Sequence, residues 1–262
     1  MRGGLTRHAA VAGLVVVAAL VVGAAPAWAS PGDASARGVA LDLSLVGRDA
    51  VSAGPFAAAD ANGPTAGTLA AVHLPDVLST GVITATASRD DKTGGVASRA
   101  STADVRLDLL RTVTGGMSAE LVEAECAATQ KGLTGKSRLV GLDLGRLGDL
   151  DLDPHPGPDL EPAPNTAVDL DLLGVDVAKV VFNEQMRGTD GSLTVNAVRL
   201  TLTGGVPGTA DLVLSSATCG PAGLPTAMAS AAGLWIGLGL LTAFGVPVGA
   251  VALRRRHELG TV

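Results

Sequence analysis

The stretch Val39-Ala40-Leu41-Asp42-Leu43-Ser44-Leu45 places apolar residues at its odd positions and small or polar residues at its even positions. Successive side chains of a β-strand point to opposite faces of a sheet. The alternation therefore predicts a strand with one buried face and one solvated face.

Similar short segments recur along the chain and are separated by turns rich in Gly, Pro and Asp. The predicted strands are 39–45, 68–74, 82–88, 96–110, 117–129, 139–144, 166–173, 175–183, 192–203 and 211–219. The Ala and Glu content of 117–129 suits a helix, but its alternation after Leu121 and the strands on both sides favour a strand. The turn Gly188-Thr189-Asp190-Gly191 predicts a hairpin.

Two segments predict connections instead of strands. Residues 52–68 are rich in Ala, Gly and Pro, which is typical of a loop. Residues 145–165 hold five prolines and predict an extended, exposed excursion, because proline donates no backbone hydrogen bond. The predicted fold class is mainly β, an antiparallel sandwich or a barrel-like domain, with a helix at each end of the chain.

The N-terminal segment 1–29 resembles a secretory signal peptide. Arg2 and Arg7 precede the apolar run 11–22, and Ala27-Trp28-Ala29 fits the small-x-small cleavage rule, which predicts a cut between Ala29 and Ser30. The alternative is an uncleaved N-terminal anchor.

The run from Ala227 to Leu253 contains no charged residue and exceeds the roughly 20 residues that cross a bilayer. It predicts one transmembrane helix. Arg254, Arg255 and Arg256 follow directly and predict a cytoplasmic C-terminus. The predicted plan is a signal peptide (1–29), an extracellular β-domain (30–219), a linker (220–226), the span (227–253) and a cytoplasmic tail (254–262). The Gly-x-x-x-Gly pairs of the span are too common in Gly-rich helices to predict an oligomeric state.

Charge and aromatic content exclude several classes of protein. The region 30–226 has 14 basic and 24 acidic residues, a formal net charge of −10, which argues against nucleic-acid binding. The chain has no Tyr, and this region keeps only Phe56 and Phe182 as aromatic residues. Aromatic sugar-binding platforms and the aromatic girdles of outer-membrane barrels are therefore not expected.

Cys126 and Cys219 are the two cysteines of the chain, and both lie in the predicted extracellular region. A pair of cysteines in an oxidising compartment predicts a disulfide bond. The alternative is two free thiols.

No recognised catalytic motif is present, and we expect no enzyme activity. Of the two histidines in the β-domain, His73 and His155, neither lies in a zinc-type or triad-type spacing. Asn183, Glu184, Gln185 and Asn196 form a polar cluster, for which we expect a structural role in pairing with backbone groups.

Closely spaced carboxylates offer one weak metal-site hypothesis. Asp149, Asp151 and Asp153 recur at every second position, and Asp169 and Asp171 follow the proline-rich segment. These residues can be read as a calcium site, but not as an EF-hand, because Pro154 stands where Gly is required. The alternatives are a solvated acidic face and, least favoured, a carboxylate-dependent hydrolase. No other cofactor is expected.

Four segments in the second half of the β-domain form a recognisable set: Pro164-Asn165-Thr166, Val180-Val181-Phe182-Asn183-Glu184-Gln185, the stretch from Ser192 to Leu200, and the stretch from Asp211 to Ala217. In these segments the chain resembles the choice-of-anchor P type of bacterial surface protein. The resemblance implies a signal peptide, a β-rich domain and a C-terminal anchor on the surface of a high-GC Gram-positive bacterium. It brings no catalytic residues.

Leu224-Pro225-Thr226-Ala227-Met228 begins like a sortase signal but has Ala and Met at its fourth and fifth positions. Retention by the membrane span is therefore the better prediction. Together these features predict a non-enzymatic structural or binding domain at the cell surface, with envelope proteins as candidate partners. The alternative is a calcium-stabilised adhesion module.

Overall fold

The computed structural model describes residues 30–45, 50–109, 111, 115–145, 159–172, 175–202 and 208–225. These residues form fifteen strands. The strands are β1 (Ala34–Leu45), β2 (Val51–Phe56), β3 (Ala59–Asp60), β4 (Ala66–Leu69), β5 (Val72–Leu74), β6 (Leu78–Thr80), β7 (Ile83–Asp90), β8 (Gly95–Leu107), β9 (Met117–Thr129), β10 (Gly132–Val140), β11 (Asp159–Leu160), β12 (Thr166–Leu172), β13 (Val175–Arg187), β14 (Leu193–Leu202) and β15 (Gly208–Cys219).

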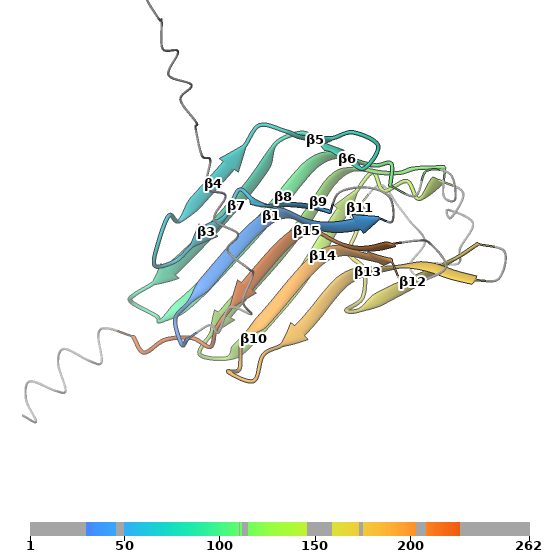
Figure 1. Cartoon of the computed structure of the whole chain (residues 1–262). Coiled ribbons are helices and arrows are strands. Elements are labelled where there is room, and N and C mark those ends of the chain that lie inside the picture. The colour runs from blue at the N-terminus through green and yellow to red at the C-terminus, as the bar shows by residue number, and fades with distance from the viewer. Residues whose placement is uncertain are drawn as a thin grey trace, which may run out of the picture.

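The strands form two antiparallel sheets that pack face to face as a sandwich, seen as two layers in Figure 1. Sheet A has the order β12-β13-β14-β15-β1-β2, with β3 also paired to β1. Sheet B has the order β11-β10-β9-β8-β6-β5, with β7 beside β8 and β4 beside β7. Of the two predicted architectures, the sandwich is the one the structure shows.

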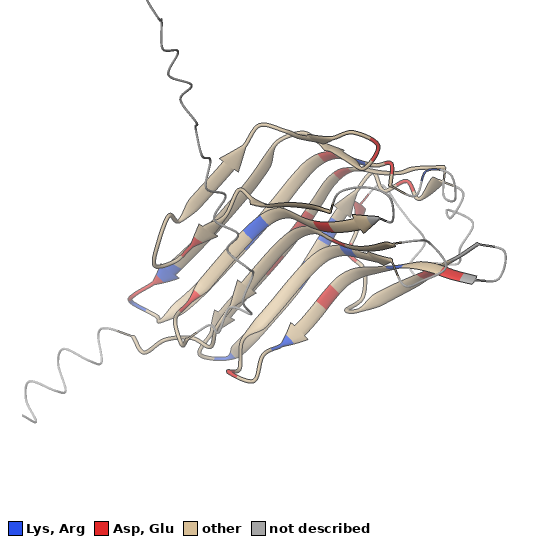
Figure 2. Ribbon diagram, viewed as in Figure 1, with Lys and Arg blue, Asp and Glu red and all other residues tan. Residues whose placement is uncertain are grey.

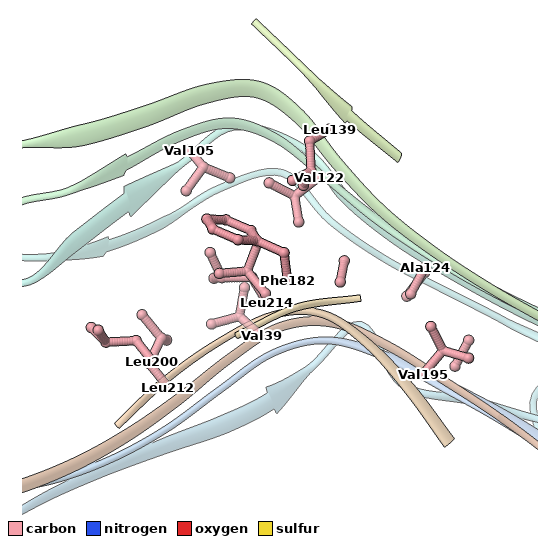
Figure 3. Packing of buried hydrophobic residues seen from close by; sticks show 14 of the residues in the cluster. Val39, Val105, Val122, Ala124, Leu139, Phe182, Val195, Leu200, Leu212 and Leu214 are labelled. Carbon is pink, nitrogen blue, oxygen red and sulfur yellow. The ribbon is translucent and has the colours of Figure 1, made fainter. Parts of the chain in front are cut away.

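The core between the sheets is built from Val, Leu and Ala side chains (Figure 3). Phe182 is the one aromatic side chain that is fully buried among the described residues. Burial of each Val or Leu side chain contributes about 1.5–3 kcal/mol, so these aliphatic side chains supply most of the stabilisation of the core. Alanines such as Ala124 and Ala217, both fully buried, allow the two sheets to approach closely.

In each central strand of sheet A the alternation of inward and outward side chains is interrupted once. These interruptions lie side by side across the sheet, at one level along the strands. In β15 the core residues change from Leu212 and Leu214 to Ala217 and Cys219, that is, from even to odd numbers. The regular pairing between strands is interrupted at this level at Asn183, Ala197, Ser215 and Gly38. Asn183 and Ser215 have positive φ angles of 50° and 54°.

Sheet B also has a row of neighbouring irregular positions. Pairing between β8 and β9 is interrupted where Asp104 faces Glu120, and the buried residues change from Thr102 to Val105 across this point. Asp104 has a φ of 49°, and Gly141, which follows β10 at the same level, has a φ of 60°. Both layers curve strongly in Figure 3, as expected when neighbouring central strands carry local irregularities at one level.

Both ends of the described domain meet at one end of the sandwich, which we call the terminal end. The Gly32 N–H donates to the Pro221 carbonyl (2.7 Å), and the Gly220 N–H donates to the Asp33 carbonyl (2.8 Å). The strand registers place the β7–β8, β9–β10 and β13–β14 turns at this end. The longer connections, β8–β9 and β10–β11 among them, join strands at the opposite end, which we call the far end.

Most predicted strands are confirmed, including 117–129 as a strand instead of a helix. Two predictions of connecting segments were wrong. Residues 52–68 were expected to be a loop but contain β3 and parts of β2 and β4, which lie at the margins of the sheets. The proline-rich segment was expected to be exposed and unpaired, yet β11 pairs with β10, and Leu160 and Pro162 are buried.

Two predicted strands have other bounds in the structure. The single predicted strand 68–74 is divided between β4, which pairs with β7, and β5, which pairs with β6. The predicted strand 139–144 misses the start of β10 at Gly132 and extends past its end at Val140.

Within the described ranges, no helix is long and apolar enough to cross a membrane. The predicted signal peptide, the predicted span 227–253 and the predicted tail lie outside the described residues.

Candidate functional site

The outer face of sheet B carries an open hollow of about 560 Å³ toward the far end. Strands β6, β8 and β9 and the segment after β10 line it. The lining residues are Ser79, Thr80, Gly81, Asp104, Val105, Arg106, Ser118, Ala119, Glu120, Gly141 and Asp143.

The hollow lies on the line where the strands of sheet B are irregular. At this level Gly81 and Gly141 present no side chain. A Cβ atom at Gly81 would lie 2.8 Å from Asp104 Oδ2, and one at Gly141 would lie 2.6 Å from Glu120 Cγ. The two glycines therefore leave room for the Asp104 and Glu120 side chains at the bend.

The charge of the hollow is negative. Asp104, Glu120 and Asp143 contribute three carboxylates, and Arg106 contributes one guanidinium group. Asp143 is held in place by a pair of backbone hydrogen bonds with Ser118 (2.8 Å each), and its Oδ1 accepts from the Gly145 N–H. This arrangement favours cationic groups and ligands that donate hydrogen bonds.

The hollow has no histidine, cysteine or aromatic side chain in its lining. Its lining therefore offers hydroxyl and carboxylate groups but no imidazole or thiol group. In the part of the chain that the structure describes, no group of three or more His, Cys, Asp or Glu side chains is placed to hold a metal ion.

Sheet B also carries a row of ion pairs between adjacent strands. Arg99 on β8 contacts Glu123 and Glu125 on β9, and Glu125 contacts Lys136 on β10 (3.1 Å). The hydrogen bond from Lys136 to Glu125 raises the pKa of Lys136. Figure 2 shows charges of both signs spread over strands and turns. The exposed Lys136–Glu125 pair contributes little to stability, whereas Glu123 is buried and has Arg99 as its partner.

Sheet A carries a second polar cluster, part of which the sequence singled out. Arg199 donates to both carboxylate oxygens of Asp211 (3.0 and 2.8 Å) and to Glu184 Oε1 (3.1 Å). The hydrogen bonds with Asp211 raise the pKa of Arg199. Asn196 Nδ2 donates to Glu184 Oε2, so this part of the cluster links β13, β14 and β15.

The two neighbouring amides join the sheets and the proline-rich segment. Asn183 Nδ2 donates to the Pro162 carbonyl (2.8 Å), and Gln185 Nε2 donates to the Gly135 carbonyl of β10 (2.9 Å). For Asn183 and Gln185 these contacts agree with the expected pairing with backbone groups, whereas Asn196 and Glu184 bond to each other through their side chains.

The predicted disulfide bond between Cys126 and Cys219 is present and joins β9 of sheet B to β15 of sheet A.

Ser30 is described and exposed, whereas Ala29 lies outside the described residues. His73 is exposed on β5, and His155 lies outside. The weak metal hypothesis (Asp149, Asp151 and Asp153) and the flanking Arg254, Arg255 and Arg256 also fall on residues that the structure does not describe.

Asp169 and Asp171 lie on β12, where Asp169 pairs across the strands with Lys179. The sequence interpretation missed Asp104, Glu120 and Asp143, because single carboxylates between apolar residues look like ordinary solvated positions. The available signal was the change of the inward-facing positions from even numbers (Thr102) to odd numbers (Val105), which marks an irregular strand.

The chain matches no protein-family model, no curated protein sequence and no solved structure.

Proposed function

We propose that this protein is a surface-displayed β-sandwich that is anchored in the cell membrane by its C-terminal span and has a non-enzymatic binding or structural role in the bacterial envelope. The apolar run 227–253, the arginines after it and the N-terminal leader support the location. The resemblance to choice-of-anchor surface proteins supports the same class. The C-terminus is then cytoplasmic and the sandwich is extracellular.

Hydrogen bonds of the linker also support an orientation of the domain relative to the membrane. The linker before the predicted span is fastened to the sandwich by the Gly32–Pro221 and Gly220–Asp33 hydrogen bonds, and the Gly223 N–H donates to the Gly94 carbonyl (2.7 Å). Gln130 Nε2 also donates to the Gly223 carbonyl (2.8 Å). An anchor that begins just after this segment holds the terminal end near the membrane and directs the far end outward.

The acidic hollow lies in the half of sheet B that faces away from the terminal end. It is then a recessed surface available to a partner outside the cell. Its carboxylates favour a basic surface of an envelope protein or a cationic group of a wall polymer. The few aromatic residues of the domain favour a weak or polyvalent contact over a hot-spot interface.

A capture experiment tests this role. Soluble protein covering 30–225 is offered purified cell-wall polymer and detergent-solubilised envelope proteins, with and without calcium. The test variant is Asp104→Asn/Glu120→Gln, which removes two charges from the hollow. The matched control is Asp42→Asn/Asp169→Asn, which removes two exposed charges from sheet A.

We expect wild-type protein and the control to retain the same partner, and the hollow variant to lose most of it. Equal capture by all three proteins would show that the hollow is not the binding surface. Capture of nothing by any of them would contradict the binding role and leave the structural one.

A further inference from the structure

The first described residues form a turn that closes on its own side chain. The Ser30 N–H donates to Asp33 Oδ2 (2.9 Å), and the Asp33 N–H donates to the Ser30 carbonyl (3.0 Å). Gly32 has a φ of 86°, a left-handed conformation that glycine adopts at little cost. The Ser30 nitrogen is thus held against a carboxylate at the surface of the terminal end.

The body of the sandwich holds the Asp33 carboxylate from its other side. Asn62 Nδ2 donates to Oδ1 (2.7 Å), and Arg89 Nη2 approaches the same oxygen at 3.4 Å. Arg89 also donates to the Gly32 carbonyl (2.8 Å) and to Asn62 Oδ1 (2.6 Å). Oδ1 is therefore used by the body of the domain, and Oδ2 is directed at Ser30.

We propose that Asp33 is the binding site for the α-ammonium group that is created when the leader is removed before Ser30. A processing peptidase would add water across the peptide bond before Ser30. The carbonyl side becomes a carboxylate on the released leader, and the Ser30 nitrogen keeps the electron pair and takes up protons to become an ammonium group. This inference rests on the proposed export.

The site needs no rearrangement to accept the new charge. The 2.9 Å distance already lies in the range of charge-assisted hydrogen bonds, and an ammonium group offers three donors where the amide offers one. The neighbouring charged groups are Arg89 from β7 and Asp60 from β3, whose Oδ1 accepts from the Asn62 N–H. Arg89 opposes the ammonium charge but is engaged by Asn62 and the Gly32 carbonyl.

The position of the cut then matters for the folded domain. A mature chain that starts one residue earlier would place its ammonium group about 3.5 Å further along the chain, beyond the reach of Asp33 Oδ2. The ammonium group of a chain that starts at Ser30 gains the Asp33 carboxylate as a hydrogen-bond partner on folding, and a chain that starts elsewhere does not.

The test uses the full chain, produced in a host that exports it and purified from membranes. N-terminal sequencing establishes where the mature chain starts, and the rate of acylation of its α-amine at pH 7 reports how tightly the ammonium group is held. The variants are Asp33→Asn, Asp42→Asn as a control that removes an exposed carboxylate elsewhere on sheet A, and a chain with one alanine added before Ser30. The last two keep the Asp33 carboxylate if Asp33→Asn fails to fold.

We expect a mature N-terminus at Ser30. We also expect acylation about threefold slower in wild type and Asp42→Asn than in the other two variants, because an opposite charge at hydrogen-bond distance favours the protonated amine. Equal rates in wild type and the alanine-added chain would overturn the proposal, as would a mature chain that starts elsewhere. Failure of the proposed surface location is a separate result, since it is read from labelling of intact cells.

Discussion

Cys126 on β9 and Cys219 on β15 join the two sheets by a disulfide bond, with their Cα atoms 5.7 Å apart. Cys219 is the last residue of the last strand, directly before the linker that leads to the predicted membrane span. A mechanical force on the anchor is therefore transmitted to sheet B through the disulfide bond and to sheet A through the hydrogen bonds of β15.

We expect replacement of both cysteines by serine to lower the free energy of unfolding by about 3–5 kcal/mol, because the bond closes a loop of 93 residues in the unfolded chain. Urea unfolding of protein covering 30–225 measures the change. Reduction of the wild-type protein serves as the control and should give a similar loss. An unchanged midpoint in both experiments would show that the bond contributes nothing to the stability of the sandwich.

Gly38 lies on the irregular line of sheet A, where a Cβ atom would fall 1.9 Å from Ile83 Cγ2 of the opposite sheet. Gly38→Ala is therefore expected to cost about 1–3 kcal/mol through overpacking. Gly63→Ala is the matched control, because its Cβ would lie 3.6 Å from the nearest atom, Asp60 Cβ. The control should change stability by no more than about 0.5 kcal/mol. Equal effects of the two substitutions on thermal unfolding would contradict the packing that the structure shows.

Ser215 links the two sheets inside the core. Its hydroxyl donates to the Val122 carbonyl (2.8 Å) and lies 3.0 Å from Thr102 Oγ1. Ser215→Ala is expected to cost about 1–3 kcal/mol, because it leaves Thr102 with one hydrogen-bond partner fewer in the core. Ser215→Gly should be less destabilising by about 1 kcal/mol, because glycine adopts the positive φ of 54° more readily than alanine. The reverse order in urea unfolding would argue against the left-handed conformation.

Arg138 holds β11 against β10 through both oxygens of Asp159 (2.8 and 2.6 Å). The hydrogen bonds from Arg138 lower the pKa of Asp159 below its ordinary value of 3.8. A carboxylate with a lowered pKa stabilises the fold above its unfolded pKa, and this contribution is lost as the pH falls through the lowered value.

Arg138→Gln should therefore return the pKa of Asp159 to its ordinary range and increase hydrogen exchange at β11 at neutral pH. An NMR titration and amide exchange measure the two effects. Lys136→Gln is the control, because Lys136 contacts Glu125 on β9 and not β11. Unaltered titration of Asp159 in the Arg138 variant would contradict the assigned cause.

Alternation in the sequence predicted most strands, because one buried face imposes a period of two on a sheet. The prediction failed for 52–68, where Ala, Gly and Pro hide the pattern. Pro55 is tolerated in β2 because that strand lies at the margin of sheet A, where a missing N–H costs no ladder hydrogen bond. The two cysteines could be paired from the sequence because they have no competitors.

The candidate hollow could not be predicted in the same way. It depends on Gly81, Asp104, Glu120 and Gly141 reaching one level of sheet B, and that depends on register between strands far apart in the sequence. The fastening of the linker to Gly32 and Gly94 is likewise a product of tertiary packing. No local pattern in 220–225 indicates it.

The most direct test of the central claim is labelling of the native protein on intact cells with a membrane-impermeant maleimide. Two variants each carry one added thiol: Ala70→Cys, at an exposed position between β4 and β5, and Val262→Cys, at the end of the predicted cytoplasmic tail. The wild-type protein, whose cysteines form the disulfide bond, is the control for background. The account predicts that Ala70→Cys is labelled on intact cells and that Val262→Cys is labelled only after the membrane is opened. Protection of Ala70→Cys on intact cells, or labelling of Val262→Cys without opening the membrane, would contradict a sandwich displayed outside the cell on a C-terminal anchor.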